Sequence, residues 1–542
     1  MFIKVTKSKN YHYLQIVESY REGGKTRHRV LFNLGRFEKL SGNQQLLSLG
    51  KRLLKLGGQP VEPLELEEET RLCYGHKVYQ KLWDKFQLSK ILTQVSRTNR
   101  IRFDLCAVIF YLVVERLLSP SSKYASWQNQ AAYLDLPQDI PLQHIYRSLD
   151  VLAQRKELIE QELFKRHRTL FNMKVDVVFY DVTTFHFESN HADELRDFGF
   201  SKAGKFNEVQ VVMGLLVDKE GRPIGYELFE GNVFDGKTLV KALKILKERF
   251  EIRKLILVAD KGLNSGANLH LIKQAGYEYV VSCRLKNESK KIKETALNQQ
   301  DFQVVRADKI TGAVTFQYKI IAEHNIQYKD EQGIKHTLKD NIVVTWSAKR
   351  AKRDRLKRQR LIEKAQQMIE QGKIPNNKKG AKKYLLTQGK EKVQGMDEEK
   401  IKKDAAWDGF YAIQYSDPNL SYDKILEHYH LLWKIEESFR VLKSTLHTRP
   451  IFHWNPKRIK GYFVLCFIAF LLERNLELIL KQKNIEGFSV EKIKAALNSL
   501  QVSKILLNGQ SLYIKGKHLP LATKILQALN IKALKNLSFP KT

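Results

Sequence analysis

Three carboxylates that are far apart in the sequence have neighbours that suit metal-dependent chemistry. Asp181 ends a largely apolar run at 175–181, and Asp260 follows a second apolar run at 255–259, so both are expected at the carboxyl ends of buried strands. The carboxyl ends of neighbouring strands share one edge of a sheet, where open α/β folds place their ligands. Glu436 lies on an expected helix that could cross this edge. Oxygen ligands without Cys or His suit Mg²⁺ or Mn²⁺, and two such ions can stabilise both the entering and the leaving oxygen of a phosphodiester displacement.

The helix expected at 422–446 has an unusual face around Glu436. Positions three and four residues apart share one face of a helix, and here that face combines aromatic rings, one acid and two cations. A metal-binding acid flanked by cations that grip phosphates explains this mixture better than a core stripe or an ordinary solvated face does. The neighbouring Glu437 points elsewhere on the helix. The residues of the face are Tyr429, Trp433, Glu436, Arg440 and Lys443.

Two simpler interpretations compete with this metal site. A single aspartate at a strand end is more often an ordinary solvated side chain, so the hypothesis depends on the three carboxylates together. A second group of possible ligands follows Asp181, but it lacks the HExxH spacing of a zinc helix and is expected in a solvated loop. That group is His186, Glu188, His191, Asp193 and Glu194.

The elements that must position these residues alternate between strands and helices. Their order predicts a mixed α/β sheet flanked by helices. A polar, alternating stretch then predicts a β-rich insert, after which the strand and helix pattern returns. The expected strands are 175–181, 209–217, 224–230, 254–259, 277–284 and 409–415, the insert strands 304–314, 316–323 and 341–346, and the helices 237–250, 267–275, 422–446 and 456–481.

The insert is followed by a strongly basic helical run at 349–360. Eight of these twelve residues are Lys or Arg, and only Asp354 opposes them. The run can be a solvated helix face or a localisation-like patch, but the charge of the whole chain favours a surface that tracks phosphates. Stretch 372–402, rich in Lys, Gly and Asn, is expected to be mobile. The cations assigned to DNA binding here are Lys349, Arg350, Lys352, Arg353 and Arg355.

Length and charge indicate a large, nucleic-acid-binding protein. At 542 residues the chain exceeds what one hydrophobic core supports, and a hydrophobic fraction of 43% is ample for packed cores. Its 93 Lys and Arg against 59 Asp and Glu give a formal charge of +34, which attracts polyphosphates because counterions are released on binding. A merely soluble basic protein and one bound to acidic membranes are the alternatives.

Cysteines and apolar runs bear on the location of the chain. Four isolated cysteines fit reduced thiols in the cytoplasm and make a structural zinc site unexpected. The first nine residues hold no apolar run, so no signal peptide is expected. The apolar runs at 105–114 and 463–472 are too short to cross a bilayer and are interpreted as buried helices.

The ends of the chain carry simpler patterns. Alternating residues around Glu22, Gly23 and Gly24 predict a β-hairpin near the N-terminus, and helical spacing follows at 76–92, 103–118 and 145–171. The tail predicts helices at 490–500 and 521–529 with a hairpin at 508–509 between them.

Several of these motifs, taken in order, resemble bacterial insertion-sequence transposases of the DDE type. Their subgroup signature is Y-x2-R-x3-E-x6-K, which Tyr429, Glu436 and Lys443 match, whereas Leu432 stands at the arginine position. The resemblance extends over the motifs at 180–184, 231–235, 258–262 and 449–450. It implies a ribonuclease-H-like mixed sheet flanked by helices and interrupted by a β-rich insertion. In such relatives an aromatic residue stacks on a flipped base, for which Trp346, Trp407 and Tyr411 are candidates, although each also suits a packing role.

The resemblance also implies an activity and partners. Asp181, Asp260 and Glu436 would hold two Mg²⁺ or Mn²⁺ ions, and Tyr429, Arg440 and Lys443 would position phosphates. The chain would cleave double-stranded DNA at transposon ends and join the freed 3′-hydroxyl to target DNA, as a homodimer. A nuclease of the same fold that does not join strands, and a non-catalytic DNA-binding derivative, are the alternatives. We expect a cytoplasmic bacterial protein that is nucleoid-associated when bound to DNA.

These patterns together predict the organisation of the chain. The expected parts are a β-hairpin region at 1–45, a helical DNA-binding region at 46–172, a catalytic core at 173–285 and 406–483, an insertion at 286–405 and a C-terminal domain at 484–542.

Overall fold

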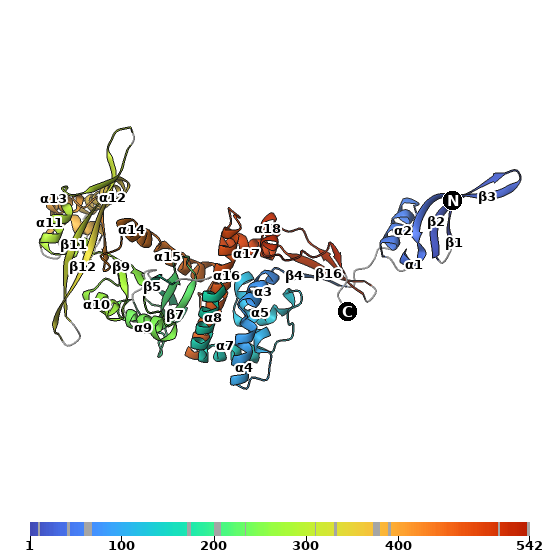
Figure 1. The fold of residues 1–542 in the computed structure, drawn as a ribbon, viewed down its shortest axis with the longest axis horizontal. Helices are drawn as coiled ribbons and strands as arrows, with labels where there is room; N and C mark the ends of the chain where they lie inside the picture. Colours follow the sequence, from blue (N-terminus) through green and yellow to red (C-terminus); the bar gives the residue numbers. More distant parts are fainter. Residues whose placement is uncertain are drawn as a thin grey trace. The chain divides into compact units, whose positions relative to one another are not determined.

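The computed structural model places most of the chain in regular elements (Figure 1). Its contacts divide the chain into two units, the first formed chiefly by Met1–Thr70 with Lys504–Tyr513 and the second by Arg71–Ser503 with Ile514–Ser538. The residues described are 1–8, 11–40, 44–58, 68–170, 175–199, 207–233, 235–308, 310–329, 333–371, 380–388, 392–507 and 510–538.

The N-terminal unit contains a three-stranded antiparallel sheet. Strands β2 (Tyr11–Glu22) and β3 (Lys25–Arg36) form the hairpin predicted from the sequence. Gly23 and Gly24 close it with φ of 57° and 79°, the left-handed conformation that a two-residue hairpin turn requires and that glycine adopts without strain. Strand β1 (Phe2–Ser8), which the sequence pattern did not indicate, pairs with β2. Helices α1 (Phe37–Leu40) and α2 (Gln44–Leu56) follow.

A helical layer precedes the main sheet. Helix α5 and the long helix α16 carry the two apolar runs, and both pack against α7 as buried helices, as expected. Two stretches predicted as single helices are each divided in two, the first at Gln87, whose φ of 52° breaks the helical path, and the second at Arg155. The bounds are α3 (His76–Lys85), α4 (Leu88–Thr98), α5 (Leu105–Leu118), α6 (Lys123–Gln128), α7 (Leu142–Gln154), α8 (Lys156–Leu170) and α16 (Pro456–Gln482).

None of the helices in the described ranges is long and apolar enough to cross a membrane. The four cysteines are all unpaired thiols.

The main sheet is the mixed sheet flanked by helices that the sequence predicts. Its first five strands in chain order are β5 (Val177–His186), β6 (Gln210–Asp218), β7 (Pro223–Glu230), β8 (Ile256–Ala259) and β9 (Glu278–Ser282). They lie in the order β7-β6-β5-β8-β9. Strand β6 is antiparallel to its neighbours, whereas β5, β8 and β9 are parallel. This is the ribonuclease-H-like arrangement. One expectation was wrong: β5 does not end at Asp181 but continues for five more residues to His186.

The insertion is built onto the same sheet. Strand β15 (Phe410–Tyr415) pairs with β9, and three insert strands continue beyond it in the order β10-β11-β12-β15 to give nine strands. These three strands of the insertion therefore extend the edge of the core sheet, whereas β13 and β14 of the insertion form a separate two-stranded sheet. Its elements are α11 (Lys290–Leu297), β10 (Gln303–Ala307), β11 (Val314–Lys329), β12 (Lys335–Ser347), α12 (Ala348–Glu370), β13 (Leu385–Gln388), β14 (Lys392–Met396) and α13 (Glu398–Ala405). Of the stretch expected to be mobile, 372–379 and 389–391 lie outside the described residues.

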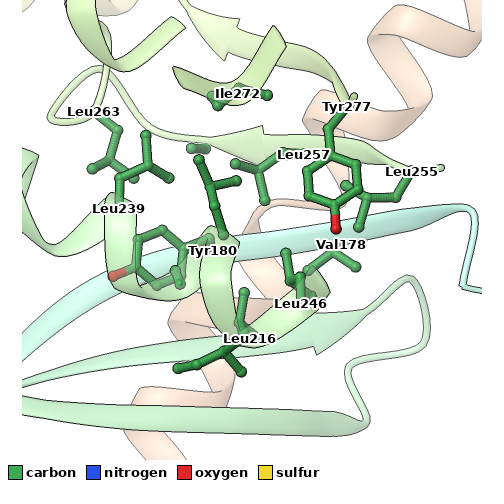
Figure 2. Close-up of a cluster of buried hydrophobic side chains, with 14 of the residues drawn as sticks. Val178, Tyr180, Leu216, Leu239, Leu246, Leu255, Leu257, Leu263, Ile272 and Tyr277 are labelled. Carbon is green, nitrogen blue, oxygen red and sulfur yellow. The ribbon is translucent and has the colours of Figure 1, made fainter. Parts of the chain in front are cut away.

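One face of the sheet is covered by a hydrophobic core. Helices α9 (Leu239–Lys244), which continues as a π-helical turn at Ile245–Arg249, and α10 (Gly266–Gln274) pack on it. Figure 2 shows Val178 and Tyr180 of β5 together with Leu257 of β8 in this core. Because side chains alternate along a strand, the odd-numbered residues of β5 face the opposite side, where Phe185 packs against Phe463 of α16.

The tail contains α17 (Val490–Asn498), β16 (Gln501–Leu507), β17 (Gln510–Lys515), α18 (Pro520–Ala528) and β18 (Leu537–Ser538). These strands form a four-stranded sheet in the order β18-β17-β16-β4 with β4 (Glu68–Cys73). Both predicted helices are present, and the predicted turn at 508–509 lies outside the described residues.

Candidate active site at the edge of the sheet

Asp181 and Asp260 lie side by side on neighbouring parallel strands. Tyr180 of β5 and Ala259 of β8 are register partners, and both belong to the hydrophobic core. The next residue along each strand is an aspartate, so both acids face away from that core. Neighbouring strands are about 4.8 Å apart, which brings the two carboxylates to one spot on the sheet. The backbone N–H of Val182 donates a 2.8 Å hydrogen bond to Oδ1 of Asp181 and fixes this side chain.

The two aspartates line a cavity of about 700 Å³. The rest of its wall comes from the residues that follow β8 and β9, from α12 and from the start of β15. Two acids therefore stand among four cations, an arrangement that suits a phosphate chain bridged to the acids by divalent cations. The charged and aromatic residues of the lining are Asp181, Asp260, Lys261, Arg284, Lys286, Arg350, Trp407, Phe410 and Tyr411.

A tyrosine pair closes one side of this cavity. The hydroxyls of Tyr411 and Tyr429 are hydrogen-bonded, and Ser282 Oγ lies 2.6 Å from the Tyr411 hydroxyl. Arg350 stacks over the Tyr411 ring with Cζ 4.3 Å from its centroid. Burial raises the pKa of Tyr429, and the charge of Asp260 raises it further, so both hydroxyls stay protonated at neutral pH. Tyr429 is thereby placed beside Asp260.

The helix predicted at 422–446 is divided into α14 (Tyr422–His430), α15 (Trp433–Arg440) and a π-helical turn at Val441–Thr445. Its backbone keeps right-handed helical angles through Leu431 and Leu432, so the side-chain faces continue across the break. Helix α15 packs on β5. Leu432 is buried, so the leucine that stands at the arginine position of the signature is a packing residue.

The two adjacent glutamates of α15 differ in environment. Glu437 pairs with Arg474 at 3.2 Å, and Arg474 in turn pairs with Glu477 at 2.6 Å. Glu437 is thus held in a structural network. Glu436 is exposed and makes no ion pair or hydrogen bond with any side chain in the described part of the chain. Arg440 is 72% exposed and lies 3.7 Å from Glu437.

Lys443 points to the strand that carries Asp181. Its Nζ donates a hydrogen bond to Oγ1 of Thr183, two residues beyond Asp181 and therefore on the same face of β5. Lys434 instead reaches the backbone carbonyl of Lys219, away from the aspartates. Of the predicted face, Tyr429 contacts Tyr411 at the cavity and Lys443 contacts the strand of Asp181, whereas Glu436 makes no side-chain contact of this kind in the described part of the chain.

The basic run forms most of α12, and its cations separate into two groups. Arg350 is partly buried at the cavity, whereas Lys349, Lys352, Arg353 and Arg355 are exposed on the helix. Arg358 pairs with Asp408 and so belongs to the packing of the insertion. Trp407 lines the cavity and also packs edge to face against Phe410. Trp346 donates a hydrogen bond to the Asp408 carbonyl, which fits a packing role.

No three His, Cys, Asp or Glu side chains among the described residues approach closely enough to form a ready metal-binding group. Two of the three predicted ligands are brought together, and the third lies on the helix that packs over the same face. The donors are carboxylate oxygens only, and this chemistry fits Mg²⁺ or Mn²⁺.

The second ligand group considered from the sequence has another role. His186 is buried at the end of β5, so its placement in a solvated loop was wrong; the reason is that β5 runs further than its apolar pattern indicates. Asp193 is paired with Arg196 at 2.8 Å.

Sequence reasoning missed the cations that surround the aspartates. Lys261 follows Asp260 directly, and Arg284 follows the parallel strand β9, where it donates hydrogen bonds of 3.1 and 2.7 Å to the Lys261 carbonyl. The aspartates were selected because open α/β folds place ligands at the carboxyl ends of neighbouring strands. The same argument would also have found these two cations, because both come just after a parallel strand.

Comparisons with known proteins agree with this geometry. Residues 173–472, more than half of the chain, match the family described as the transposase DDE domain, and residues 3–64 match the IS1634 family transposase N-terminal domain. No curated protein matches the chain in sequence.

Among solved structures, the chain is similar to one described as the cryo-EM structure of a piggyBac transposase synaptic complex with hairpin DNA. The two are 8% identical with a TM-score of 0.36, over 79% of this chain and 80% of that chain, a similarity too distant to support a functional assignment. The family match, together with paired aspartates at the edge of a ribonuclease-H-like sheet, settles the class: the chain belongs to the DDE-domain transposases of insertion sequences.

Proposed function

We propose that Asp181, Asp260 and Glu436 hold two divalent cations, Mg²⁺ or Mn²⁺, and that this site cleaves DNA at transposon ends and joins the freed 3′-hydroxyl to target DNA. The observation that carries the proposal is that Tyr180 and Ala259 are register partners on parallel strands, and that the residues after them, Asp181 and Asp260, line one cavity. Bound there, two such cations supply the positive charge that stabilises the entering and leaving oxygens of a phosphodiester displacement.

The position of Glu436 supports its role as the third ligand. It lies seven residues after Tyr429, which contacts Tyr411 in the wall of the cavity, and seven residues before Lys443, which contacts Thr183. Glu436 therefore lies in the chain between two contacts with the site, which supports a position from which it can reach the aspartates. Its neighbour Glu437 is engaged by Arg474 and is a poor candidate.

The surrounding side chains would bind and orient DNA. Lys443, Arg440 and Tyr429 would hold phosphates next to the scissile bond, and Arg350 would hold a phosphate at the cavity wall. The exposed cations of α12, Lys349, Lys352, Arg353 and Arg355, would follow the duplex further away. Trp407 at the cavity wall is the aromatic residue placed best for a displaced base.

We also propose that two copies of the chain act together, each on one transposon end, and that the regions at 1–45 and 46–172 recognise the end sequence. The basic charge of the whole chain supports contact with double-stranded DNA over more than the active site.

The adjacent glutamates offer a matched experimental pair. Glu436→Gln should lower cleavage of labelled end DNA by about 10³-fold or more, since a lost ligand removes several kcal/mol of transition-state stabilisation. Binding of the same DNA without metal should change little, because its affinity comes from many phosphate contacts. Glu437→Gln, which keeps side-chain size, should retain cleavage once its folding is verified by circular dichroism. Near wild-type cleavage by Glu436→Gln, or loss confined to Glu437→Gln, would refute the assignment.

A further inference from the structure

A second cavity, of about 660 Å³, lies among the helices and is lined by five basic residues and no acid. Its walls come from the end of α5, the start of α6, α7, α16 and the loop that follows the π-helical turn at Val441–Thr445. The residues that line it are Arg116, Pro120, Ser121, Ser122, Lys123, Tyr124, Tyr146, His447, Arg449, Pro450, Phe452, His453 and Tyr462.

Lys123 is the residue that the fold of this cavity does not explain. Its side chain is 3% exposed, and within the described residues its Nζ has no hydrogen-bond acceptor. Glu115 is the nearest acid that acts on it, but that carboxylate accepts a 2.6 Å hydrogen bond from Tyr133 and forms no ion pair with Lys123 among the described residues. A buried ammonium without an acceptor is strongly unfavourable unless an anion joins it.

The other basic residues of the wall have different states. Arg116 has a structural role, because its guanidinium donates hydrogen bonds to the carbonyls of Leu446, His447 and Ser121. Burial lowers the pKa of His453 to about 3, so this ring is neutral at physiological pH. Arg449 is partly exposed at the cavity and is available to an anion together with Lys123.

Burial, together with the nearby charge of Arg116, lowers the pKa of Lys123 to about 7. An anion in the cavity would favour the charged ammonium and reverse this effect. The charged form of Lys123 is therefore favourable in this position only when a negatively charged group lies beside it.

Exposed aromatic rings stand at the same cavity. Tyr124 is 52% exposed and Phe452 is 60% exposed, although both are large apolar side chains that a fold normally covers. Aromatic rings beside cations are the usual platform for the bases of an unpaired nucleic-acid strand.

The cavity is also connected to the active-site helix. The loop that supplies His447, Arg449 and Phe452 begins where the helical segment carrying Glu436 and Lys443 ends. Arg116 ties this loop to α5 through two backbone carbonyls. A DNA strand that follows the helix past Lys443 is led towards this cavity.

We propose that this cavity is a second DNA site that takes one unpaired nucleotide, with its phosphate at Lys123 and Arg449 and its base against Tyr124 or Phe452. The proposal rests on the action of the chain on DNA, but not on the identity of the metal ligands. It adds a contact for the strand that leaves the acidic cavity.

The test is binding of a fluorescein-labelled single-stranded oligonucleotide to the full chain in EDTA, followed by anisotropy at several salt concentrations. Lys123→Met should weaken binding about tenfold, the effect of one lost hydrogen bond between charged groups. It should also reduce the slope of log K against log salt by ~0.7. Lys247→Met is the matched control, because Lys247 is exposed on the π-helical turn at Ile245–Arg249 outside the cavity, and it should bind like the wild type.

Two further measurements locate the nucleotide. Tyr124→Ala should weaken the same oligonucleotide about tenfold through lost stacking. An oligonucleotide with 5-iodouracil should cross-link to Tyr124 or Phe452 on irradiation, as mapped by mass spectrometry. Arg449→Gln, a change at a partly exposed residue, provides a second test of the phosphate contact should Lys123→Met fold poorly.

Unchanged affinity and slope in both Lys123→Met and Arg449→Gln would overturn the proposal. Inorganic phosphate that raises the Tm of the wild type but not of Lys123→Met, with equal oligonucleotide affinities, would assign the cavity to a free anion and also overturn it. Because no metal is present, loss of binding in Lys123→Met upholds this site even if Glu436→Gln still cleaves DNA.

Discussion

The cavity lined by Asp181 and Asp260, called the acidic cavity, and the Lys123 cavity belong to the same unit of the molecule, but only the first has carboxylates in its wall. The first places Asp181 and Asp260 at the open edge of a sheet, where water and nearby cations moderate their repulsion. The second buries Lys123 among helices without an acid in its wall. The comparison shows two environments for a charged group. Like charges can lie together at a solvated strand end, whereas a charge buried among helices without a partner lowers the stability of the fold.

The two cavities also differ in how far apart in the sequence their residues lie. The aspartates are brought together by one parallel strand pair, whose members are 79 positions apart. The Lys123 cavity needs α5 and α6 to meet a loop that lies about 330 residues later, as the contacts from Arg116 to Leu446 and His447 show. Local sequence patterns therefore predict the residues of the first cavity but not those of the second.

Lys443 gives the largest effect that would sharpen this comparison, because it contacts Thr183 on the strand of Asp181 and lies on the helical segment that ends at the loop of the Lys123 cavity. Lys443→Ala should reduce cleavage of end DNA by about 10²-fold, as expected when one group that stabilises a developing charge is removed. Metal affinity should be kept, since the ammonium of Lys443, which donates to Thr183, has no lone pair with which to bind a metal ion. Lys443→Arg should retain more activity because a cation remains. Metal titration beside a cleavage assay checks both expectations. A fall in metal affinity as large as that of Glu436→Gln would contradict the division of roles along this helix.

The sequence predicted part of the candidate site. The apolar runs before Asp181 and Asp260 are local signals, and the strands that they form pair in register. The three- and four-residue spacing from Tyr429 to Lys443 is also local, and the structure brings Lys443 to the strand of Asp181. The role of Glu436 as a third ligand stays a prediction. The mixed α/β sheet was predicted from the alternation of strands and helices, and its ribonuclease-H-like character from the resemblance to transposases, but the order of the strands within the sheet was not predicted.

Other features could not be predicted because they depend on distant contacts. The pairing of β15 with β9, which joins the insertion to the core sheet, links segments more than 120 positions apart. The burial of Leu432 and His186 is decided by the helices and strands that pack over them, and neither residue has a sequence pattern that indicates it. Lys123 sits in a short helix among polar residues, which by itself suggests a surface position.

The next largest effect is expected on folding stability, which measures how much the buried ammonium of Lys123 destabilises the fold. Lys123→Met should raise the free energy of unfolding by about 1–3 kcal/mol near pH 6, because an apolar side chain of similar length replaces an unpaired buried charge. Burial, aided by Arg116, lowers the pKa of Lys123 to about 7 in the folded chain, below its ordinary value of 10.5. Between these two pH values the unfolded chain binds more protons, so the wild type gains stability as pH rises.

The advantage of Lys123→Met should therefore be full below pH 7 and shrink as pH rises from 7 towards 10. Urea unfolding of both proteins at pH 6 and pH 9 measures it, and other titrating groups cancel in the difference. A lower stability of Lys123→Met at pH 6 would mean that Lys123 is a structural residue, and would break the contrast between the two cavities.

The smallest effect concerns the basic helix α12, which lies at the wall of the acidic cavity. Arg350 and Lys352 are two residues apart, but Arg350 lines the cavity whereas Lys352 is exposed away from it. If each holds one phosphate of duplex DNA, Arg350→Gln and Lys352→Gln should each reduce the slope of log K against log salt by ~0.9. Only Arg350→Gln should also slow cleavage, because only Arg350 stacks on Tyr411 beside Asp260. Anisotropy titrations of end DNA over a salt series, together with cleavage rates, separate the two residues. An unchanged slope in Lys352→Gln would mark the outer face of α12 as merely solvated, and the DNA path would then be confined to the cavity wall.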